Sequence, residues 1–286
     1  MWYGVPCAPS ARAPASLQTR YSSCSTVPYQ GGWMSRQNSC LALAALLTAG
    51  CAQADTPAFD RPGIAFSTTT LPRGGVSWEQ GLPDFQRDDG GVRSTQYSAA
   101  TNLRIGLADG VEIQLSGSPF NTTRTRGAPS EHGAGDSGVA LKLALPSQAD
   151  KFSWALLAGA TFGTGARGFT ARSITDNGTQ YSVATTLGYD VSDAVTSALY
   201  FAVNRLDGET TYAWSPSLGF AIDGRFGAFV EAGFEHSEGG PSTRVAGGGF
   251  TWMATPRLQL DLSMDFGLND AAPDVQGGVG FSLYFE

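Results

Sequence analysis

Residues 258–268 read LQLDLSMDFGL and alternate between large apolar side chains and polar or small ones. Successive side chains of a β-strand point to opposite faces, so this alternation predicts a strand with one apolar face and one wettable face. Residues 210–222 and 226–236 repeat the pattern. The chain is therefore expected to be built from two-faced strands.

Followed along the chain, the alternation predicts twelve strands. Their approximate bounds are 73–80, 94–107, 111–120, 136–145, 152–162, 179–190, 194–205, 210–222, 226–237, 243–254, 258–268 and 275–285. Most are close to the roughly 9–11 residues that cross a bilayer at a tilt of about 45°. Every second connection is tight, whereas 81–93, 121–135 and 163–178 are expected to be long polar loops. Short turns at one end and longer loops at the other are typical of an outer-membrane barrel.

The chemistry of the two faces predicts which one lines the inside. The polar faces are mostly Gly, Ala, Ser and Thr with a few charges, and the apolar faces are Leu, Val and aromatic residues. Bulky groups facing lipid and small polar groups facing a lumen explain this pattern. We therefore expect an all-β, transmembrane, antiparallel up-and-down β-barrel, with a soluble sandwich or lipocalin-like barrel as the alternative. Two aromatic girdles are expected, with Tyr97, Phe162, Tyr181 and Trp214 near the loops and Trp154, Tyr189, Phe226, Trp252 and Phe285 near the turns.

Composition excludes other classes of protein. Only 15% of the 286 residues are charged, 37 are Gly, and no run of about 18 apolar residues is present, which argues against a helical membrane protein. Three of the 18 Lys and Arg residues lie before residue 55, but none of the 25 Asp and Glu residues does. The remainder is acidic, so nucleic acid is not an expected partner.

The N-terminal residues have the features of an export signal. Residues 34–54 combine Arg36, an apolar stretch at 41–49 and a small-residue site, which predicts a signal peptide cleaved after Ala54. Residues 1–33 are then an upstream extension from a mis-assigned start, or alternatively an ordered extension. The lipobox-like sequence 48–51 leaves acylation of Cys51 as a second alternative. Residues 55–72 are expected to be a periplasmic segment or a short plug, and 73–286 the barrel.

Charged residues on the predicted inner faces are the sharpest candidate site. By parity these are Glu79, Arg104, Glu112, Lys142, Asp190, Glu231, Glu235, Asp261 and Asp265. Charges in a narrow lumen must be paired or wet, because an isolated buried charge is costly. Two interpretations stay open: a rigidifying ion-pair network, or a constriction that selects solutes.

Two further groups of residues point to partners in the envelope. Arginines expected at the loop end suit lipopolysaccharide phosphates, with ordinary solvated loop charge as the alternative. They are Arg124, Arg126, Arg167 and Arg172, together with Arg87, Arg93, Arg205 and Arg244. At the C-terminus, Gly280, Leu283 and Phe285 have the spacing of a signal for the barrel-assembly machinery.

Several stretches resemble a known family. They include LRIGL at 103–107, VEIQL at 111–115, LQLDL at 258–262 and GVGFSLYF at 278–285. Together they are similar to the MetA-pathway of phenol degradation family of outer-membrane transporters. The resemblance implies a barrel that passes small, often aromatic or hydrophobic compounds across the bacterial outer membrane.

Signs of catalysis are weak. His132 and His236 both fall in or beside expected loops, and the GTGARG stretch at 163–168 lacks the helix that a dinucleotide site needs. We expect no enzyme activity, no cofactor and no metal. The predicted function is passive passage of small solutes, and the alternative is a closed structural or lipid-interacting barrel.

Overall fold

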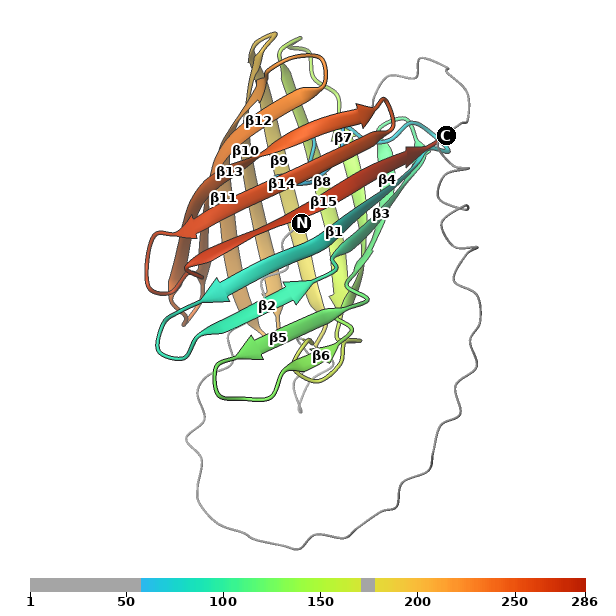
Figure 1. Ribbon diagram of the computed structural model, residues 1–286. Helices are drawn as coiled ribbons and strands as arrows, with labels where there is room; N and C mark the ends of the chain where they lie inside the picture. Colours follow the sequence, from blue (N-terminus) through green and yellow to red (C-terminus); the bar gives the residue numbers. More distant parts are fainter. Residues whose placement is uncertain (1–57, 171–177) are drawn as a thin grey trace, which may run out of the picture. The chain divides into compact units, whose positions relative to one another are not determined.

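The computed structural model describes residues 58–170 and 178–286, and these form one antiparallel sheet of fifteen strands (Figure 1). The strands are β1 (Val76–Asp88), β2 (Ser94–Ser98), β3 (Thr101–Ala108), β4 (Val111–Gly117), β5 (Asn121–Thr125), β6 (Glu131–Gly133), β7 (Ser137–Leu145), β8 (Phe152–Phe162), β9 (Gln180–Ser192), β10 (Val195–Leu206), β11 (Glu209–Ala221), β12 (Phe226–Ser237), β13 (Ser242–Thr255), β14 (Leu258–Gly267) and β15 (Val275–Phe285). No helix in the described residues is long and apolar enough to cross a membrane.

The sheet closes on itself because β15 pairs with β1, from Val76 opposite Phe285 to Arg87 opposite Val275. The ring contains twelve strands in the order β1, β3, β4 and then β7 through β15, so the predicted twelve-stranded barrel is confirmed. Strands β2, β5 and β6 continue the wall beyond the ring at the loop end (Figure 1). Closure leaves the ring without an exposed edge, as a spanning sheet requires.

The predicted strand positions are mostly confirmed, and 226–237 and 275–285 match β12 and β15 residue for residue. The first strand is the main correction, because the expected loop at 81–93 is largely strand. This stretch was expected to be a loop because it is long and polar, and Pro83 within it cannot donate a ladder hydrogen bond. The structure instead places a register shift between Gly81 and Asp84, after which pairing with β15 resumes.

A second correction concerns the loop end of the next strands. The predicted strand 94–107 is divided into β2 and β3. The expected loop at 121–135 contains β5 and β6, which form a hairpin, and β5 also pairs with β2. Alternation in these stretches of three to five residues was too weak to identify them from sequence.

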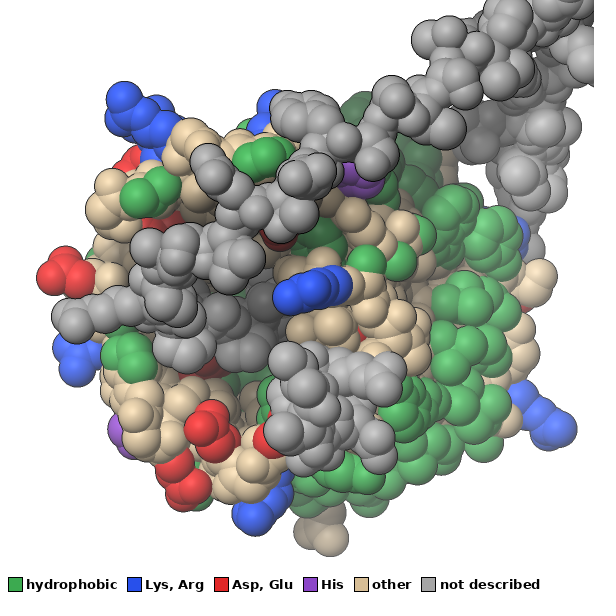
Figure 2. All heavy atoms as spheres, turned by 90° about the horizontal axis from the view of Figure 1, so that it is seen from below, with side chains coloured by type: hydrophobic (Ala, Val, Ile, Leu, Met, Phe, Trp, Pro, Cys, Tyr) green, Lys and Arg blue, Asp and Glu red, His purple; other side chains and the backbone are tan. Residues whose placement is uncertain are grey.

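The faces are inverted relative to a soluble barrel, as predicted. On β14, Leu260, Met264 and Phe266 are 39–53% exposed, whereas Asp261 and Asp265 are 4% and 1% exposed. The exposed aromatic residues include Phe162, Tyr181 and Trp214 towards the loops and Tyr189, Phe226 and Trp252 towards the turns. Figure 2 shows hydrophobic side chains gathered on one flank of the barrel and charged ones around its end. An apolar outer belt of this extent needs lipid to cover it.

Candidate functional site

The inward-facing charges predicted by parity are buried with two exceptions. Glu79, Arg104, Glu112, Lys142 and Asp265 are no more than 1% exposed, and Glu231 and Asp261 are 6% and 4% exposed. Glu235 is only partly buried, close to the loop end of β12. Asp190 is a correction: it lies near the turn after β9 and is exposed, so it does not line the interior.

The N-terminal segment, residues 58–72, contacts inward-facing side chains on strands all around the ring. In chain order, Asp60 binds β3, β4 and β7, Arg61 binds β1 and β14, and Ile64 binds β12. Further along, Phe66 packs against Tyr200 of β10, Thr68 bonds to Ser153 of β8, and the Leu71 amide donates to Glu112 of β4. The chain therefore makes a circuit of the inner wall before it enters β1.

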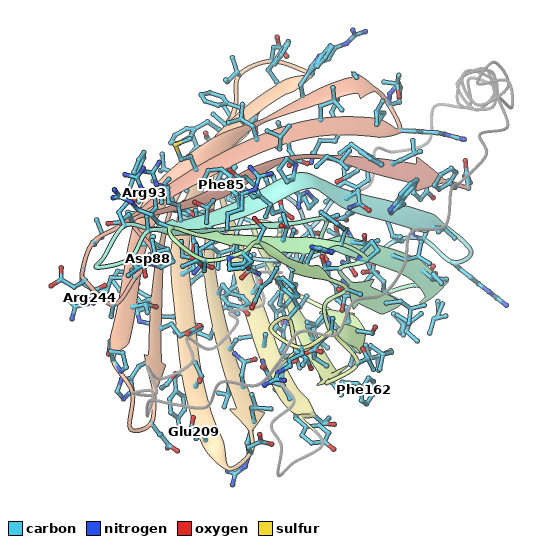
Figure 3. The ribbon with its side chains drawn as sticks, turned by 60° about the horizontal axis from the view of Figure 1, so that its bottom comes forward. Phe85, Asp88, Arg93, Phe162, Glu209 and Arg244 are labelled. Carbon is cyan, nitrogen blue, oxygen red and sulfur yellow. The ribbon has the colours of Figure 1, made fainter. Side chains whose placement is uncertain are left out.

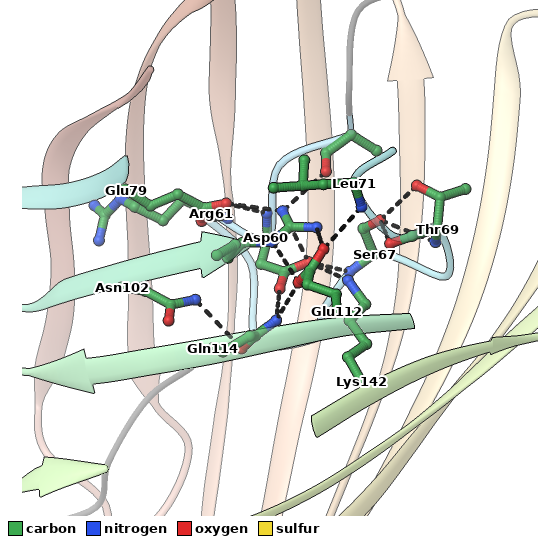
Figure 4. Close-up of polar contacts among 12 residues, drawn as sticks. Asp60, Arg61, Ser67, Thr69, Leu71, Glu79, Asn102, Glu112, Gln114 and Lys142 are labelled. Atoms are coloured by element: carbon green, nitrogen blue, oxygen red, sulfur yellow. Dashed lines mark hydrogen bonds and ion pairs between the residues drawn. The ribbon is translucent and has the colours of Figure 1, made fainter. Parts of the chain in front are cut away.

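Asp60 is the centre of the most buried polar cluster (Figure 4). Its Oδ1 accepts hydrogen bonds of 2.8 Å from Lys142 Nζ and 2.9 Å from the Ser67 amide. Its Oδ2 accepts one of 2.8 Å from Gln114 Nε2. Arg104 Nη1 lies 3.4 Å from Oδ1. Each carboxylate oxygen therefore has a partner at hydrogen-bonding distance.

Arg104 joins this cluster to two acidic side chains of the wall, Glu112 and Glu79. Its Nε and Nη2 donate to the two carboxylate oxygens of Glu112 at 2.8 and 2.9 Å. Nη1 donates to Glu79 Oε1 at 2.9 Å and to the carbonyl oxygen of Ala58 at 2.9 Å. Such bidentate geometry uses the planar fork of arginine. The wall carboxylates also accept from the segment, because the amides of Asp60 and Arg61 donate to Glu79.

The electrostatics of the cluster favour an ionised Asp60. Burial by itself would raise the pKa of its carboxyl group, but the neighbouring charges of Arg104 and Lys142 outweigh burial and hold that pKa far below its usual range. Asp60 therefore remains an anion at any physiological pH.

Arg61 makes the complementary contacts with acidic side chains. Nη1 and Nη2 donate to Asp84 at 3.2 and 3.0 Å, and Nη2 also donates to Asp261 at 3.1 Å. Gly280 provides the space, since a Cβ there would lie 2.5 Å from Nη2. Burial would lower the pKa of Arg61, but Asp84 and Asp261 more than compensate and raise it.

A small apolar compartment lies beside the charged cluster. Phe66 of the segment packs on inward-facing side chains of β8, β9 and β10, namely Ala155, Leu157, Ala184 and Ala202. These are mostly alanines, so the wall leaves room for one aromatic ring. Most of the other large apolar side chains in the described residues face outward, so this compartment is the main buried apolar cluster there.

The interior wall formed by β12 and β14 is acidic and only partly neutralised. Glu231 Oε2 accepts a 2.8 Å hydrogen bond from the Ile64 amide, but its Oε1 has no partner in the described protein. Asp265 Oδ1 and Asp261 Oδ2 are likewise buried without a protein partner. Buried polar oxygens of this kind require water or solute. In the described part of the chain, no group of three or more His, Cys, Asp and Glu is arranged to hold a metal ion.

The loop-end arginines fall into two groups. Arg87 and Arg93 pair with Asp89, with N–O distances of 2.7 and 2.5 Å. Figure 3 shows Arg93 close to Asp88. Arg124, Arg126 and Arg167 are exposed, and Arg124 lies 5.9 Å from the centre of the Tyr97 ring. Arg172 lies outside the described residues, as do residues 1–57 with the predicted signal peptide and Cys51.

A pocket of about 490 Å³ opens near the loop end of β11, β12 and β13. It is lined mainly by outward-facing side chains, including Trp214, Phe234, His236 and Arg244. The rings of Trp214 and Phe234 are stacked with their centres 4.1 Å apart, and Arg244 is exposed at the end of the barrel that carries the loops (Figure 3). Of the inward-facing charges described above, Glu235 alone also lines this pocket.

At the C-terminus, Gly280 faces the interior, while Leu283 lies opposite Trp78 and Phe285 opposite Val76 on β1. All three stand in the closing strand of the barrel. Their role as an assembly signal stays a prediction. The close approach of Arg61 is a separate, structural reason for a glycine at position 280.

The residues that sequence reasoning missed are those of the segment itself. Asp60, Arg61 and Phe66 belong to a stretch without strand periodicity, so alternation could not predict which way their side chains point. An Asp-Arg pair next to an aromatic residue, ahead of a barrel with buried charges, was the available signal.

Comparison with known families identifies the chain. The family model described as "Putative MetA-pathway of phenol degradation" matches residues 59–285. The chain belongs to this family. The resemblance found in the sequence is thereby confirmed, and the match includes the segment that enters the barrel.

Solved structures of similar fold are outer-membrane barrels. The COG4313 outer membrane channel from Pseudomonas putida F1 is 12% identical, with a TM-score of 0.59 over 78% of this chain and 99% of that one. The KdgM porin (10% identical, TM-score 0.46, covering 74% and 99%) and a TodX monoaromatic hydrocarbon channel mutant (8%, 0.44, covering 76% and 91%) are more distant. A search of curated protein sequences finds no match.

Proposed function

We propose that this protein is an outer-membrane channel for small solutes, aromatic ones among them, and that residues 58–72 act as its plug. The observation that carries the proposal is the pair of neighbouring residues Asp60 and Arg61, which neutralise buried charges on separate parts of the inner wall. A wall that served only to rigidify the barrel would pair its own charges. Here Lys142 and Asp261 find their ion-pair partners on the plug.

Support also comes from the family, the barrel fold and the inverted faces. The small inward-facing residues leave space that the plug occupies, and the polar oxygens left without a protein partner indicate a wet interior. With the plug withdrawn, solute would pass between an alanine-rich wall at β8–β10 and an acidic wall at β12–β14. The competing function is a permanently closed, structural barrel in which the plug never leaves.

A reversible disulfide between the plug and the barrel wall distinguishes the two functions. The hydroxyls of Thr68 on the plug and Ser153 on β8 are 2.7 Å apart, and all four cysteines of the chain lie before residue 55. The Thr68→Cys, Ser153→Cys variant of the processed barrel should form a disulfide, because the two oxygens that the sulfur atoms replace are already in contact. We expect single-channel currents in planar bilayers that disappear on oxidation and return with a reducing agent.

The matched control is the single variant Thr68→Cys, whose currents should not respond to oxidant or reductant. Currents that survive a fully formed disulfide would show that solute does not need the plug to move. Absence of current in every form, with the barrel correctly folded by heat-dependent gel migration, would favour the closed structural barrel.

We further propose that the outward pocket holds a phosphate group of lipopolysaccharide. Arg244 and His236 supply donors, Trp214 and Phe234 supply an apolar shelf, and the pocket lies where strands leave the bilayer at the loop end. The exposed Arg124, Arg126 and Arg167 lie on other parts of the loop end, where they could contact further phosphate groups.

This assignment is tested by measuring, with mass spectrometry, the lipid that stays bound to the barrel during purification. Arg244→Gln should reduce the lipopolysaccharide retained per barrel, whereas Arg225→Gln, in the turn at the opposite end, should not. Equal retention by both variants would refute the pocket. Barrel assembly by the assembly machinery and export by cleavage after Ala54 complete the proposed route to the outer membrane.

A further inference from the structure

Two side chains of the plug together resemble a small molecule. Asp60 supplies a carboxylate and Phe66 an aromatic ring, and both are about 95% buried inside the barrel. The loop between them is closed on itself, because the Ser67 amide donates to Asp60 Oδ1 at 2.9 Å. The carboxylate and the ring are therefore held as one compact unit against the wall.

A single wall residue contacts both groups. Lys142 Nζ donates to Asp60 Oδ1 at 2.8 Å and lies 5.4 Å from the centre of the Phe66 ring. Both distances suit an ammonium group, which binds a carboxylate directly and a ring face by cation–π attraction. Arg104, 3.4 Å from the same carboxylate oxygen, adds a second positive charge.

The ring has its own complementary surface. Tyr200 meets Phe66 edge to face, with ring centres 6.0 Å apart at an angle of 88°. Ala155, Leu157, Ala184 and Ala202 form the rest of the compartment. These residues belong to the barrel wall, so the compartment persists when the plug leaves.

We infer that the plug occupies a solute site of the channel, and that the solute class is a small aromatic carboxylate. The inference rests on the proposed function, since the site becomes available only when the plug withdraws. A solute that carries a carboxylate and an aromatic ring reproduces the contacts of Asp60 and Phe66 and competes with them. A phenol or an aromatic alcohol supplies only the ring, and an aliphatic acid only the charge.

The test uses three matched probes: 3-phenylpropanoate, the neutral alcohol 3-phenylpropan-1-ol, and butyrate. Binding to the detergent-solubilised barrel is measured by calorimetry. The double variant Asp60→Asn, Phe66→Ala removes the internal competitor while leaving the wall intact. We expect it to bind 3-phenylpropanoate at least about tenfold more tightly than the parent protein does, and about tenfold more tightly than it binds either other probe.

Two wall variants in this background separate the charge from the ring pocket. Lys142→Met should remove the preference for the acid over the alcohol. Ala202→Leu fills the compartment without touching a charge, and should weaken the acid and the alcohol to a similar extent. If Lys142→Met fails to fold, as heat-dependent gel migration would show, Ala202→Leu still tests the site.

Equal affinity of the double variant for all three probes, or binding unaffected by Ala202→Leu, would overturn the inference. Conductance of the same variants separates this failure from failure of the proposed function. A double variant that conducts but does not prefer the aromatic acid leaves the channel intact and removes the assigned ligand. A variant that binds the acid but never conducts keeps the site and contradicts the channel.

Discussion

Asp60 and Arg61 are neighbours in the chain, yet their side chains bind different parts of the barrel wall. Asp60 accepts from Lys142 of β7 at 2.8 Å, and Arg61 donates to Asp261 of β14 at 3.1 Å. The adjacent opposite charges therefore fasten the plug at two separate places on the ring. This arrangement lets each contact be weakened separately.

Asp60→Asn should release the plug. The substitution leaves the Lys142 ammonium group buried without its anionic partner, and breaking a buried pair in this way costs about 3 kcal/mol, or roughly a 100-fold change in the docking equilibrium. We expect a higher open fraction in single-channel recordings. Asp89→Asn makes the same chemical change at an exposed loop ion pair and should leave the open fraction unchanged. An open fraction equal in both variants would contradict the proposal that the Asp60–Lys142 ion pair holds the plug in place.

The ion pair by which Asp60 holds the plug should persist at mildly acidic pH. Because its pKa in the docked state is lowered, its contribution to docking is fully present above the pKa of the undocked carboxyl, about 4, and is lost only as pH falls through the docked value. We expect no release through this residue between pH 7 and about pH 4. The open fractions of the parent and of Asp60→Asn should therefore change with pH in the same way across this range. Convergence of the two profiles above about pH 5 would mean that the docked Asp60 is protonated above the usual range of a carboxyl, which would contradict a lowered pKa.

Gly106→Ala should prevent the plug from seating where it joins β1. A Cβ at this position would lie 2.0 Å from the carbonyl oxygen of Pro72, and that backbone is fixed by hydrogen bonds of 2.9 Å between Gly106 and residues 74 and 75. Higher conductance with normal heat-dependent gel migration is the expected result. Gly224→Ala is the control, since a Cβ there meets nothing within 4 Å. Unaltered conductance in Gly106→Ala would show that the backbone adapts.

The acidic wall should give the open channel a cation preference. Glu231→Gln with Asp261→Asn removes two inward-facing charges, so reversal potentials in a KCl gradient should move towards zero. The measurement belongs in the Asp60→Asn background, where the plug is released. Asp193→Asn, in an exposed turn, is the matched control. An unchanged reversal potential would mean that these carboxylates do not face the ion path.

The direction of each strand side chain was predictable because strand geometry is local. Alternation alone placed Glu79, Arg104, Glu112, Lys142 and Asp265 inside the barrel, and it placed Leu260 and Phe266 outside. It failed for Asp190, where the strand runs out beyond the barrel interior, and at Gly81–Asp84, where a bulge carries the first strand past a proline.

The ion-pair partners of these charged side chains could not be predicted from the alternation. The Arg61 guanidinium binds Asp261 across 200 positions of sequence, and Asp60 binds Lys142 across 82. No periodicity links a coil segment to strands so distant, because their proximity arises only when β15 closes against β1.

By itself, the sequence determined a barrel with apolar side chains outside and small or charged ones inside, since two-residue periodicity and the bilayer's demand for paired backbone are properties of each strand. Only the tertiary structure decided that the interior is filled by residues 58–72 and that Asp60, Arg61 and Phe66 complete its charged and apolar surfaces. Ring closure brings those surfaces together around one segment, and their complementarity exists only in three dimensions.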